Sequence, residues 1–193
     1  MLRNMKIVSK EKFLAEKEFY INEIRKGKIF VYPTDTIYGI GCDATNSDSV
    51  LKIRKAKKRE EKPFSVIAPF KEWIKKNCVV DGKTEEWIGK LPGAYTLILK
   101  LENRKAVAKE VNGGQEGLGV RIPDNWFSNI VSQLGKPFVT TSVNLSGEKN
   151  MESIDDLKDD MKEYIDYVVY EGKKEGRGSM IVNLIGEEKI KER

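Results

Sequence analysis

The sequence of 193 residues contains no histidine. This absence excludes imidazole metal ligands and every catalytic arrangement in which a histidine activates a serine or a cysteine. Chemistry on this chain must therefore depend on binding, orientation and charge.

Cysteine is also scarce, because the chain has only Cys42 and Cys78. Two thiols are too few for a disulfide framework, and their spacing does not match a zinc site. We predict that both are buried free thiols and that no residue is a dedicated metal ligand.

Long apolar runs are missing as well. No segment approaches the roughly 20 residues of a membrane-spanning helix, and residues 1–12 are charged rather than signal-like. We therefore expect a cytoplasmic protein without membrane contact. Because no shift in composition marks a boundary, we expect one domain over residues 1–193.

Basic residues exceed acidic ones, with 35 Lys and Arg against 30 Asp and Glu. The net charge of +5 is compatible with a phosphate-bearing partner, and a solvated basic surface is the more common explanation. Six cations lie in the eight residues 52–59: Lys52, Arg54, Lys55, Lys57, Lys58 and Arg59. They form either a solvated face of a helix or part of a site. The second interpretation applies because an apolar strand begins directly after Lys62-Pro63, which brings the end of this helix to a sheet edge.

Helical and strand patterns alternate along the chain, which predicts an α/β fold with a mixed, twisted sheet. Helices are expected over residues 10–26, 46–56, 70–76, 84–90, 125–134 and 153–164. Strands are expected over residues 29–32, 64–67, 96–101, 118–122, 137–141, 167–170 and 179–184. Asn46 or Ser47 and Asp124 are the expected caps, and residues 102–117 a loop.

Hydroxyl side chains flank several of these strands: Thr34, Thr36, Thr140, Thr141, Ser142, Ser146 and Ser179. In one cleft with Lys57, Arg59 and Arg121, they would bind a small zwitterion and a polyphosphate. Arg121 is either an edge cation or a buried cation that needs an anionic partner. Periodicity does not show that these residues converge, and residues 33–43 taken alone also fit an ordinary strand-to-helix connection.

Several motifs, in this order, resemble those of the YrdC-type L-threonylcarbamoyladenylate synthases. They are Pro33–Ala44, Lys57-Lys58-Arg59 with Lys62-Pro63-Phe64, Pro92–Thr96, Val120–Pro123, Ser142–Gly147 and Ser179–Val182. The resemblance covers residues 29–193 and includes the K-x-R and S-x-N signatures of the family. It implies a YrdC-like twisted mixed sheet, flanked by helices, around a large cavity.

The resemblance implies a nucleotidyltransferase that joins L-threonine, bicarbonate and ATP into threonylcarbamoyl-AMP and pyrophosphate, for tRNA t6A37 modification. Mg²⁺ would arrive with ATP rather than in a dedicated site. The expected partners are a tRNA threonylcarbamoyltransferase that receives the product and, by direct contact, tRNA or double-stranded RNA.

The resemblance also assigns residues to the two substrates. Those for L-threonine are Thr34, Arg121, Ser142 and Ser179, and those for ATP are Lys57, Arg59, Thr140, Asn144 and Arg193. The expected catalytic residues are Lys57, Arg59, Ser142 and Asn144. A threonine carbamate can attack the α-phosphate itself, so the protein need only align it and neutralise pyrophosphate.

Some positions depart from the family pattern, namely Glu60, Ala94 and Asn125. The short segment after K-x-R is similar to the YrdC module of hydrogenase-maturation carbamoyltransferases. Carbamoyl transfer is disfavoured, because the other parts of those enzymes are missing. The rival function is that of a non-catalytic YrdC-like RNA-binding or ribosome-maturation factor using the same basic cavity.

The last residues after the strand at 179–184 suggest a short returning strand. If residues 189–193 pair back, Ile190 would pack inward and Arg193 would fold over the ATP site. A solvated tail is the other interpretation.

Overall fold

The computed structural model describes residues 5–59, 61–145 and 148–192. Within these residues the strands form one ten-stranded sheet in the order β1-β8-β2-β3-β7-β4-β6-β5-β9-β10. The strands are β1 (Lys6–Ser9), β2 (Phe30–Pro33), β3 (Tyr38–Gly41), β4 (Ser65–Ile67), β5 (Tyr95–Lys100), β6 (Gly117–Arg121), β7 (Phe138–Ser142), β8 (Tyr167–Tyr170), β9 (Met180–Asn183) and β10 (Lys189–Lys191).

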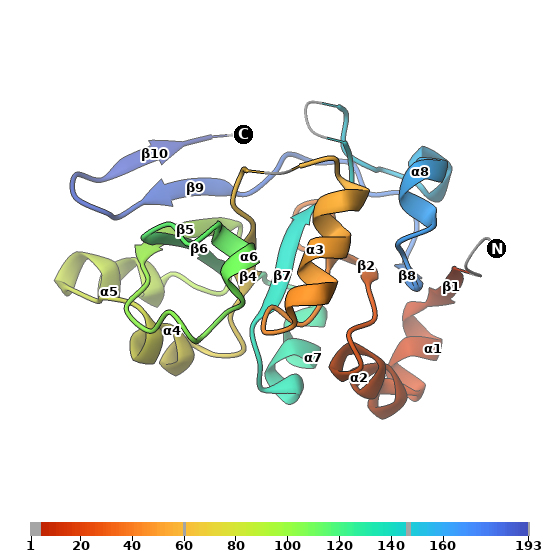
Figure 1. Ribbon diagram of the computed structural model, residues 1–193, viewed down its shortest axis with the longest axis horizontal. Coiled ribbons are helices and arrows are strands. Elements are labelled where there is room, and N and C mark those ends of the chain that lie inside the picture. Colours follow the sequence, from red (N-terminus) through yellow and green to blue (C-terminus); the bar gives the residue numbers. More distant parts are fainter. Residues whose placement is uncertain (1–4, 60, 146–147, 193) are drawn as a thin grey trace.

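Parallel and antiparallel pairs are mixed in this sheet, as the sequence predicts. β8 lies parallel to both β1 and β2, while β7 joins β3 and β4 through antiparallel ladders. Figure 1 shows β1 and β8 at one end of the molecule and the β9–β10 hairpin at the other. β7 therefore links the two halves of the sheet.

Helices cover both faces of the sheet. They are α1 (Lys10–Ala15), α2 (Lys17–Arg25), α3 (Ser47–Ala56), α4 (Lys71–Asn77), α5 (Gly82–Gly89), α6 (Lys109–Asn112), α7 (Phe127–Leu134) and α8 (Asp159–Lys162), with a 3₁₀ turn η1 (Ile154–Asp156). Side chains of α1, α2 and α7 share one buried apolar cluster with the sheet, whereas those of α3, α4, α5 and α8 share another. Neighbouring residues of one strand, such as Val31 and Tyr32, enter different clusters because strand side chains alternate between faces.

The expected helix over residues 10–26 is split in two at Glu16, whose φ of −112° and ψ of 26° are not helical. The break accompanies aromatic packing. The rings of Phe13 and Tyr20 stack with centroids 4.6 Å apart, and both meet Phe30 edge-on. This packing stabilises two short helices where sequence periodicity predicts a continuous one.

The expected helix over residues 153–164 is wrong, because only η1 and α8 form there. The Asp156 carboxylate accepts hydrogen bonds from the backbone N–H groups of Glu152 and Ser153. These bonds belong to a capping box that starts η1. The chain then leaves helical geometry at Leu157 and Lys158, whose ψ angles of 111° and 141° separate η1 from α8.

Two other local predictions are wrong. Asp124 does not cap α7; its backbone N–H donates to Asp35, and Asn125 Oδ1 accepts from the N–H of Phe127 instead. Residues 102–117 contain the short helix α6 rather than only a loop, since the carbonyls of Ala108 and Lys109 accept hydrogen bonds from residues 111 and 114. Asn46, by contrast, caps α3 through the N–H of Ser49, as predicted.

Both cysteines are buried and free, which confirms their prediction. Burial raises the pKa of the Cys78 thiol to about 12 and the pKa of Cys42 well above its ordinary value. These thiols are protonated at neutral pH and inert. In the part of the chain that the structure describes, none of the helices is long and apolar enough to span a membrane.

The chain end pairs back as predicted, because β10 lies antiparallel to β9. Trp87 of α5 holds this hairpin: its indole N–H donates to Glu188 at 3.1 Å. The expectation for Ile190 is wrong, since its side chain is 52% exposed at the sheet edge. Arg193 lies outside the described residues.

Candidate functional site

The ends of several strands place hydroxyl groups around one pocket. Its polar lining residues are Thr34, Thr36, Ser65, Thr96, Arg121, Thr140, Thr141, Ser142 and Ser179. These residues come from the β2–β3 turn, β4, β5, β6, β7 and the start of β9. The predicted hydroxyls and Arg121 therefore converge, except for Ser146, which lies outside the described residues. Lys57 and Arg59, which were expected in the same cleft, do not line this pocket. We call this the hydroxyl pocket.

Ser65 and Thr96 are pocket residues that sequence reasoning missed. Thr96 Oγ1 lies 2.6 Å from Ser179 Oγ in a buried contact where either hydroxyl can donate. Ser65 faces Gly119 so closely that a Cβ atom at residue 119 would lie 2.4 Å from Ser65 Oγ. Only glycine permits this approach of β4 to β6. The two hydroxyls lie in strands, where alternation could have indicated their common face.

Arg121 is a buried cation rather than an edge cation, with 6% of its surface exposed. Its Nη2 atom donates to Asp35 Oδ1 at 2.5 Å, and burial lowers the pKa of the guanidinium while the Asp35 charge raises it. Among the described residues, its buried Nε–H has no hydrogen-bond acceptor. Asp35 is the anionic partner that the sequence required but did not identify. The fork of Arg121 can bind a further anion.

The hydroxyl of Thr34 is occupied by its own turn. It donates to the carbonyl of Ile37 at 2.7 Å and accepts from the N–H groups of Thr36 and Ile37. Thr36 Oγ1 lies 3.0 Å away and is the more accessible group, since Thr36 is half-buried and Thr34 buried. Thr34 thus shapes the pocket entrance, and its predicted contact with substrate stays a prediction.

The K-x-R and S-x-N signatures meet at the C-terminal end of α3. Lys57 is only 1% exposed, and its Nζ donates to the carbonyls of Ser142 and Asn144 and to Asn144 Oδ1, at 2.5, 2.6 and 3.2 Å. Ser142 Oγ also donates to Asn144 Oδ1. A positive φ of 47° at Lys58 turns the chain, so that Lys57 points inward and Lys58 outward. The signatures therefore form one hydrogen-bonded corner beside the hydroxyl pocket.

Burial, together with the smaller effect of the nearby charge of Arg59, lowers the pKa of Lys57 to about 7. The three oxygen acceptors favour the charged ammonium, but they do not replace the water that burial removes. A phosphate near this lysine would raise its pKa again.

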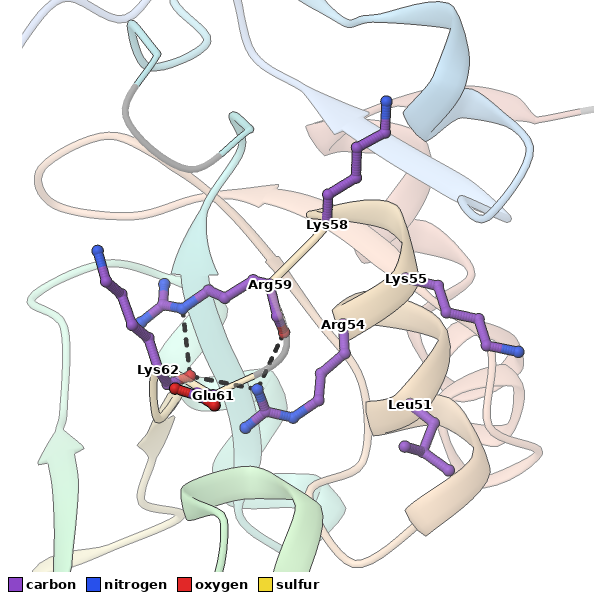
Figure 2. Close-up of a pocket in the computed structure, with 7 residues that line it drawn as sticks. All are labelled: Leu51, Arg54, Lys55, Lys58, Arg59, Glu61 and Lys62. Atoms are coloured by element: carbon purple, nitrogen blue, oxygen red, sulfur yellow. Dashed lines mark hydrogen bonds between the residues drawn. The ribbon is translucent and has the colours of Figure 1, made fainter.

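The basic run 52–59 does not act as a single surface. Figure 2 shows Arg54 and Arg59 turned toward the segment that follows α3, with Lys55 and Lys58 pointing away from it. Arg59 donates to the carbonyls of Lys62 and Pro63, and its Nη1 lies 3.5 Å from Thr141 Oγ1. Both earlier interpretations hold in part: some cations are solvated, and others bring charge to β7.

Two hollows share lining residues with the hydroxyl pocket. One, of about 530 Å³, shares Ser65 and Thr96 and extends to Arg59. The other, of about 610 Å³, shares Thr36 with the pocket and extends to Glu192 near the chain end. The hydroxyl pocket itself encloses only about 40 Å³, so the space at this site is divided among three hollows rather than forming the single large cavity that was expected. Among the described residues, no group of three or more His, Cys, Asp or Glu side chains could hold a metal ion.

Comparison with known proteins gives a consistent result. The Sua5/YciO/YrdC family model, described as "Telomere recombination", matches residues 22–192. A putative threonylcarbamoyl-AMP synthase from Methanocaldococcus jannaschii is 36% identical over 173 residues, which are 86% of this chain and 79% of the relative. The threonylcarbamoyl-AMP synthase of Mus musculus is 31% identical over 141 residues, which are 72% of this chain and 50% of the relative.

Two solved structures share the fold. P. abyssi Sua5 complexed with L-threonine has a TM-score of 0.80 at 24% identity, over 93% of this chain and 54% of that one. E. coli YciO has a TM-score of 0.84 at 20% identity, over 98% of this chain and 95% of that one. This chain thus spans about half the length of P. abyssi Sua5 and of the mouse relative.

Proposed function

The chain belongs to the Sua5/YciO/YrdC family, and we propose that it is an L-threonylcarbamoyladenylate synthase. It would make threonylcarbamoyl-AMP and pyrophosphate from L-threonine, bicarbonate and ATP. One observation carries the proposal: Arg121, with a buried Nε–H that has no acceptor among the described residues, lines the same pocket as Ser142, whose carbonyl binds Lys57. A carboxylate site thereby adjoins a phosphate site.

L-threonine would occupy the hydroxyl pocket with its carboxylate on Arg121. A carboxylate oxygen is the acceptor that the unpaired Nε–H lacks, and charge-assisted bonds of this kind are among the stronger ones in proteins. The hydroxyls of Thr36 and Ser179 line the same pocket and can orient the amino and hydroxyl groups. Ser142, at the end of β7, would lie between the amino acid and the nucleotide.

ATP would lie in the adjoining hollow that reaches Arg59, with its phosphates toward Lys57, Asn144 and Thr140. All three donors of Lys57 are already used, so a phosphate oxygen must replace one acceptor. The contact with Asn144 Oδ1 is the longest, at 3.2 Å, and is the one we expect to be exchanged. That exchange would release the Asn144 side-chain amide from Lys57, so that the amide could bind the nucleotide.

The reaction needs no protein nucleophile and no imidazole. The amino group of L-threonine and bicarbonate first give a carbamate, with loss of one water. A carbamate oxygen then attacks the α-phosphate, the bond to the β-phosphate breaks, and pyrophosphate leaves with its negative charge neutralised by Lys57 and Arg59. Mg²⁺ would be held mainly by the ATP phosphates, because the described residues offer no carboxylate cluster for a dedicated site.

The product would pass to a tRNA threonylcarbamoyltransferase. Contact with tRNA or double-stranded RNA would use the groove of about 830 Å³ beside α3, where Lys55, Lys58 and Lys62 are exposed. A purely RNA-binding function does not explain the interior of the protein. A buried arginine inside a hydroxyl pocket contributes nothing to a phosphate-backbone contact, so the catalytic function is favoured.

The decisive experiment is pyrophosphate release from ATP by the purified chain, with L-threonine or bicarbonate omitted in turn. We expect release to require both, and Lys57→Ala to lower kcat/KM at least about tenfold, since charge-assisted phosphate contacts contribute about 1.5–3 kcal/mol. Lys55→Ala, in the same helix but exposed, is the matched control and should retain wild-type rates. Release independent of L-threonine, or equal rates in both variants, would contradict the proposal.

A further inference from the structure

Asp35 connects the β2–β3 turn to Arg121 of β6, which lines the hydroxyl pocket. Its Oδ1 accepts from Arg121 Nη2 at 2.5 Å, and its Oδ2 accepts from the backbone N–H of Asp124 at 3.0 Å. The two charged side chains are buried, with 10% of Asp35 and 7% of Arg121 exposed. Both carboxylate oxygens of Asp35 are therefore engaged, and each has a different partner.

The separate partners of the two Asp35 oxygens determine which hydrogen-bond donors of the Arg121 guanidinium are used. A carboxylate that only balances a buried arginine commonly binds it through two parallel N–H···O bonds. Asp35 contacts Arg121 through one oxygen and anchors the other on the backbone, which leaves the Nε–H without an acceptor among the described residues. The ion pair holds the guanidinium while leaving part of its fork available.

The backbone that carries Asp35 is itself fixed. Thr34 Oγ1 accepts from the N–H groups of Thr36 and Ile37, so the hydrogen bonds of this turn enclose residue 35. The second anchor, the N–H of Asp124, lies three residues after the end of β6. Asp35 thus has little freedom, and the position of the arginine fork follows from it.

We propose that Asp35 is a positioning residue for the amino-acid carboxylate and acts through Arg121. It fixes the guanidinium so that its remaining N–H donors meet the substrate, and it compensates the buried charge when the pocket is empty. This inference rests on the proposed function, and no contact of Asp35 with the substrate is needed. Its effect should therefore appear in the affinity for the amino acid and leave that for ATP unchanged.

The test is Asp35→Asn, with KM measured separately for L-threonine and ATP. The amide is similar in shape, but it has one acceptor oxygen and no charge, so it cannot hold both anchors. We expect KM for L-threonine to rise at least about tenfold and KM for ATP to change less than about twofold. Asp35→Glu keeps the charge but is longer, and should give an intermediate KM for L-threonine.

Asp43→Asn is the matched control. Asp43 is buried, with one oxygen on the backbone N–H of Thr45 and the other on Lys136. Its cation partner Lys136 does not line the hydroxyl pocket, whereas Arg121, the partner of Asp35, does. The Asp43→Asn variant should lose stability and keep both KM values. Wild-type KM for L-threonine in either folded Asp35 variant, or equal rises in both KM values, would overturn the proposal. Failure of both Asp35 variants to fold would assign the residue to the fold alone and overturn it as well.

Calorimetric binding of L-threonine separates this inference from the proposed activity. If the wild-type chain binds L-threonine without releasing pyrophosphate, the activity is wrong, and the same titration of Asp35→Asn still tests the positioning role. Loss of affinity in that variant alone supports it, whereas equal affinity in the Asp35→Asn and Asp43→Asn variants refutes it.

Discussion

The buried ammonium of Lys57 predicts how the stability of this protein depends on pH. Its pKa is about 7 in the fold against an ordinary value of 10.5, so the unfolded chain binds more protons than the folded one between these values. Stability therefore rises with pH in that window, because the free energy of unfolding increases wherever the unfolded state holds the extra proton. At pH 7 the folded lysine is half protonated, and about one pH unit lower both states are protonated and the dependence disappears.

The magnitude follows from the two pKa values. From pH 7 to pH 8.5 the folded lysine loses its remaining half proton while the unfolded lysine stays protonated, which adds about 1.5 kcal/mol to the free energy of unfolding. Above this range Cys42 and Cys78 oppose the effect, since their pKa values are raised in the fold and their thiols ionise first in the unfolded chain. The useful window is therefore pH 7 to 8.5.

The measurement is urea unfolding under reducing conditions at several pH values in this window. Between pH 7 and 8.5 the free energy of unfolding of the wild type should increase. In Lys57→Met, which has no ammonium, that increase should be smaller by about 1.5 kcal/mol. Lys58→Met is the control, because the side chain of residue 58 is 64% exposed, and it should keep the wild-type slope. Parallel profiles for wild type and Lys57→Met would refute the argument that burial outweighs the three acceptor oxygens.

Three further predictions concern the site and the sheet. If phosphate raises the pKa of Lys57, MgATP binding at pH 7.5 should take up roughly three quarters of a proton. The binding enthalpy measured by calorimetry should then vary with the ionisation enthalpy of the buffer, and an enthalpy that does not vary would contradict this. Gly41→Ala should lower the free energy of unfolding in urea by about 3 kcal/mol, because its Cβ would lie 1.9 Å from a carbonyl oxygen of β7. Gly89→Ala is the control: its Cβ would enter open space, so the change should be neutral or stabilising. Trp87→Phe should lose the hydrogen bond to Glu188 and lower the free energy of unfolding by about 1 kcal/mol. Hydrogen exchange should become faster only in the β9–β10 hairpin, and equally faster exchange across the whole chain would contradict this local effect.

Much of the sheet could be predicted because apolar runs with β-branched residues mark β2, β4, β5, β7 and β8. β3 was missed, since Gly39 and Gly41 make its sequence look like a turn. The structure requires glycine at residue 41, where a Cβ would lie 1.9 Å from the carbonyl oxygen of Val139, and a Cβ on Gly39 would press on the Tyr32 ring at 3.0 Å. β1 was missed as well, because its short segment is stabilised by β8, far away in the sequence.

The candidate site shows the same division between local and distant information. Family motifs identified Lys57 and Arg121. In the structure Arg121 lines the hydroxyl pocket, and Lys57 binds the carbonyl of Ser142, another residue of that pocket. Asp35 lay within a quoted motif but received no role, because its partner Arg121 is 86 residues away. No spacing rule connects the two, since three strand-to-strand steps separate β3 from β6 in the sheet order.

The pairing of the early strands with β8 also determines when this protein can fold during synthesis. Phe30 of β2 pairs with Tyr167 of β8, so 137 residues must be translated before that ladder can form. At about 5–20 residues per second, the wait is roughly 7–30 s. β5 likewise waits for β9, the strand that follows Ser179. The nascent chain therefore exposes unpaired strands until nearly the whole sequence has emerged, and its catalytic cavity is completed among the last parts of the molecule.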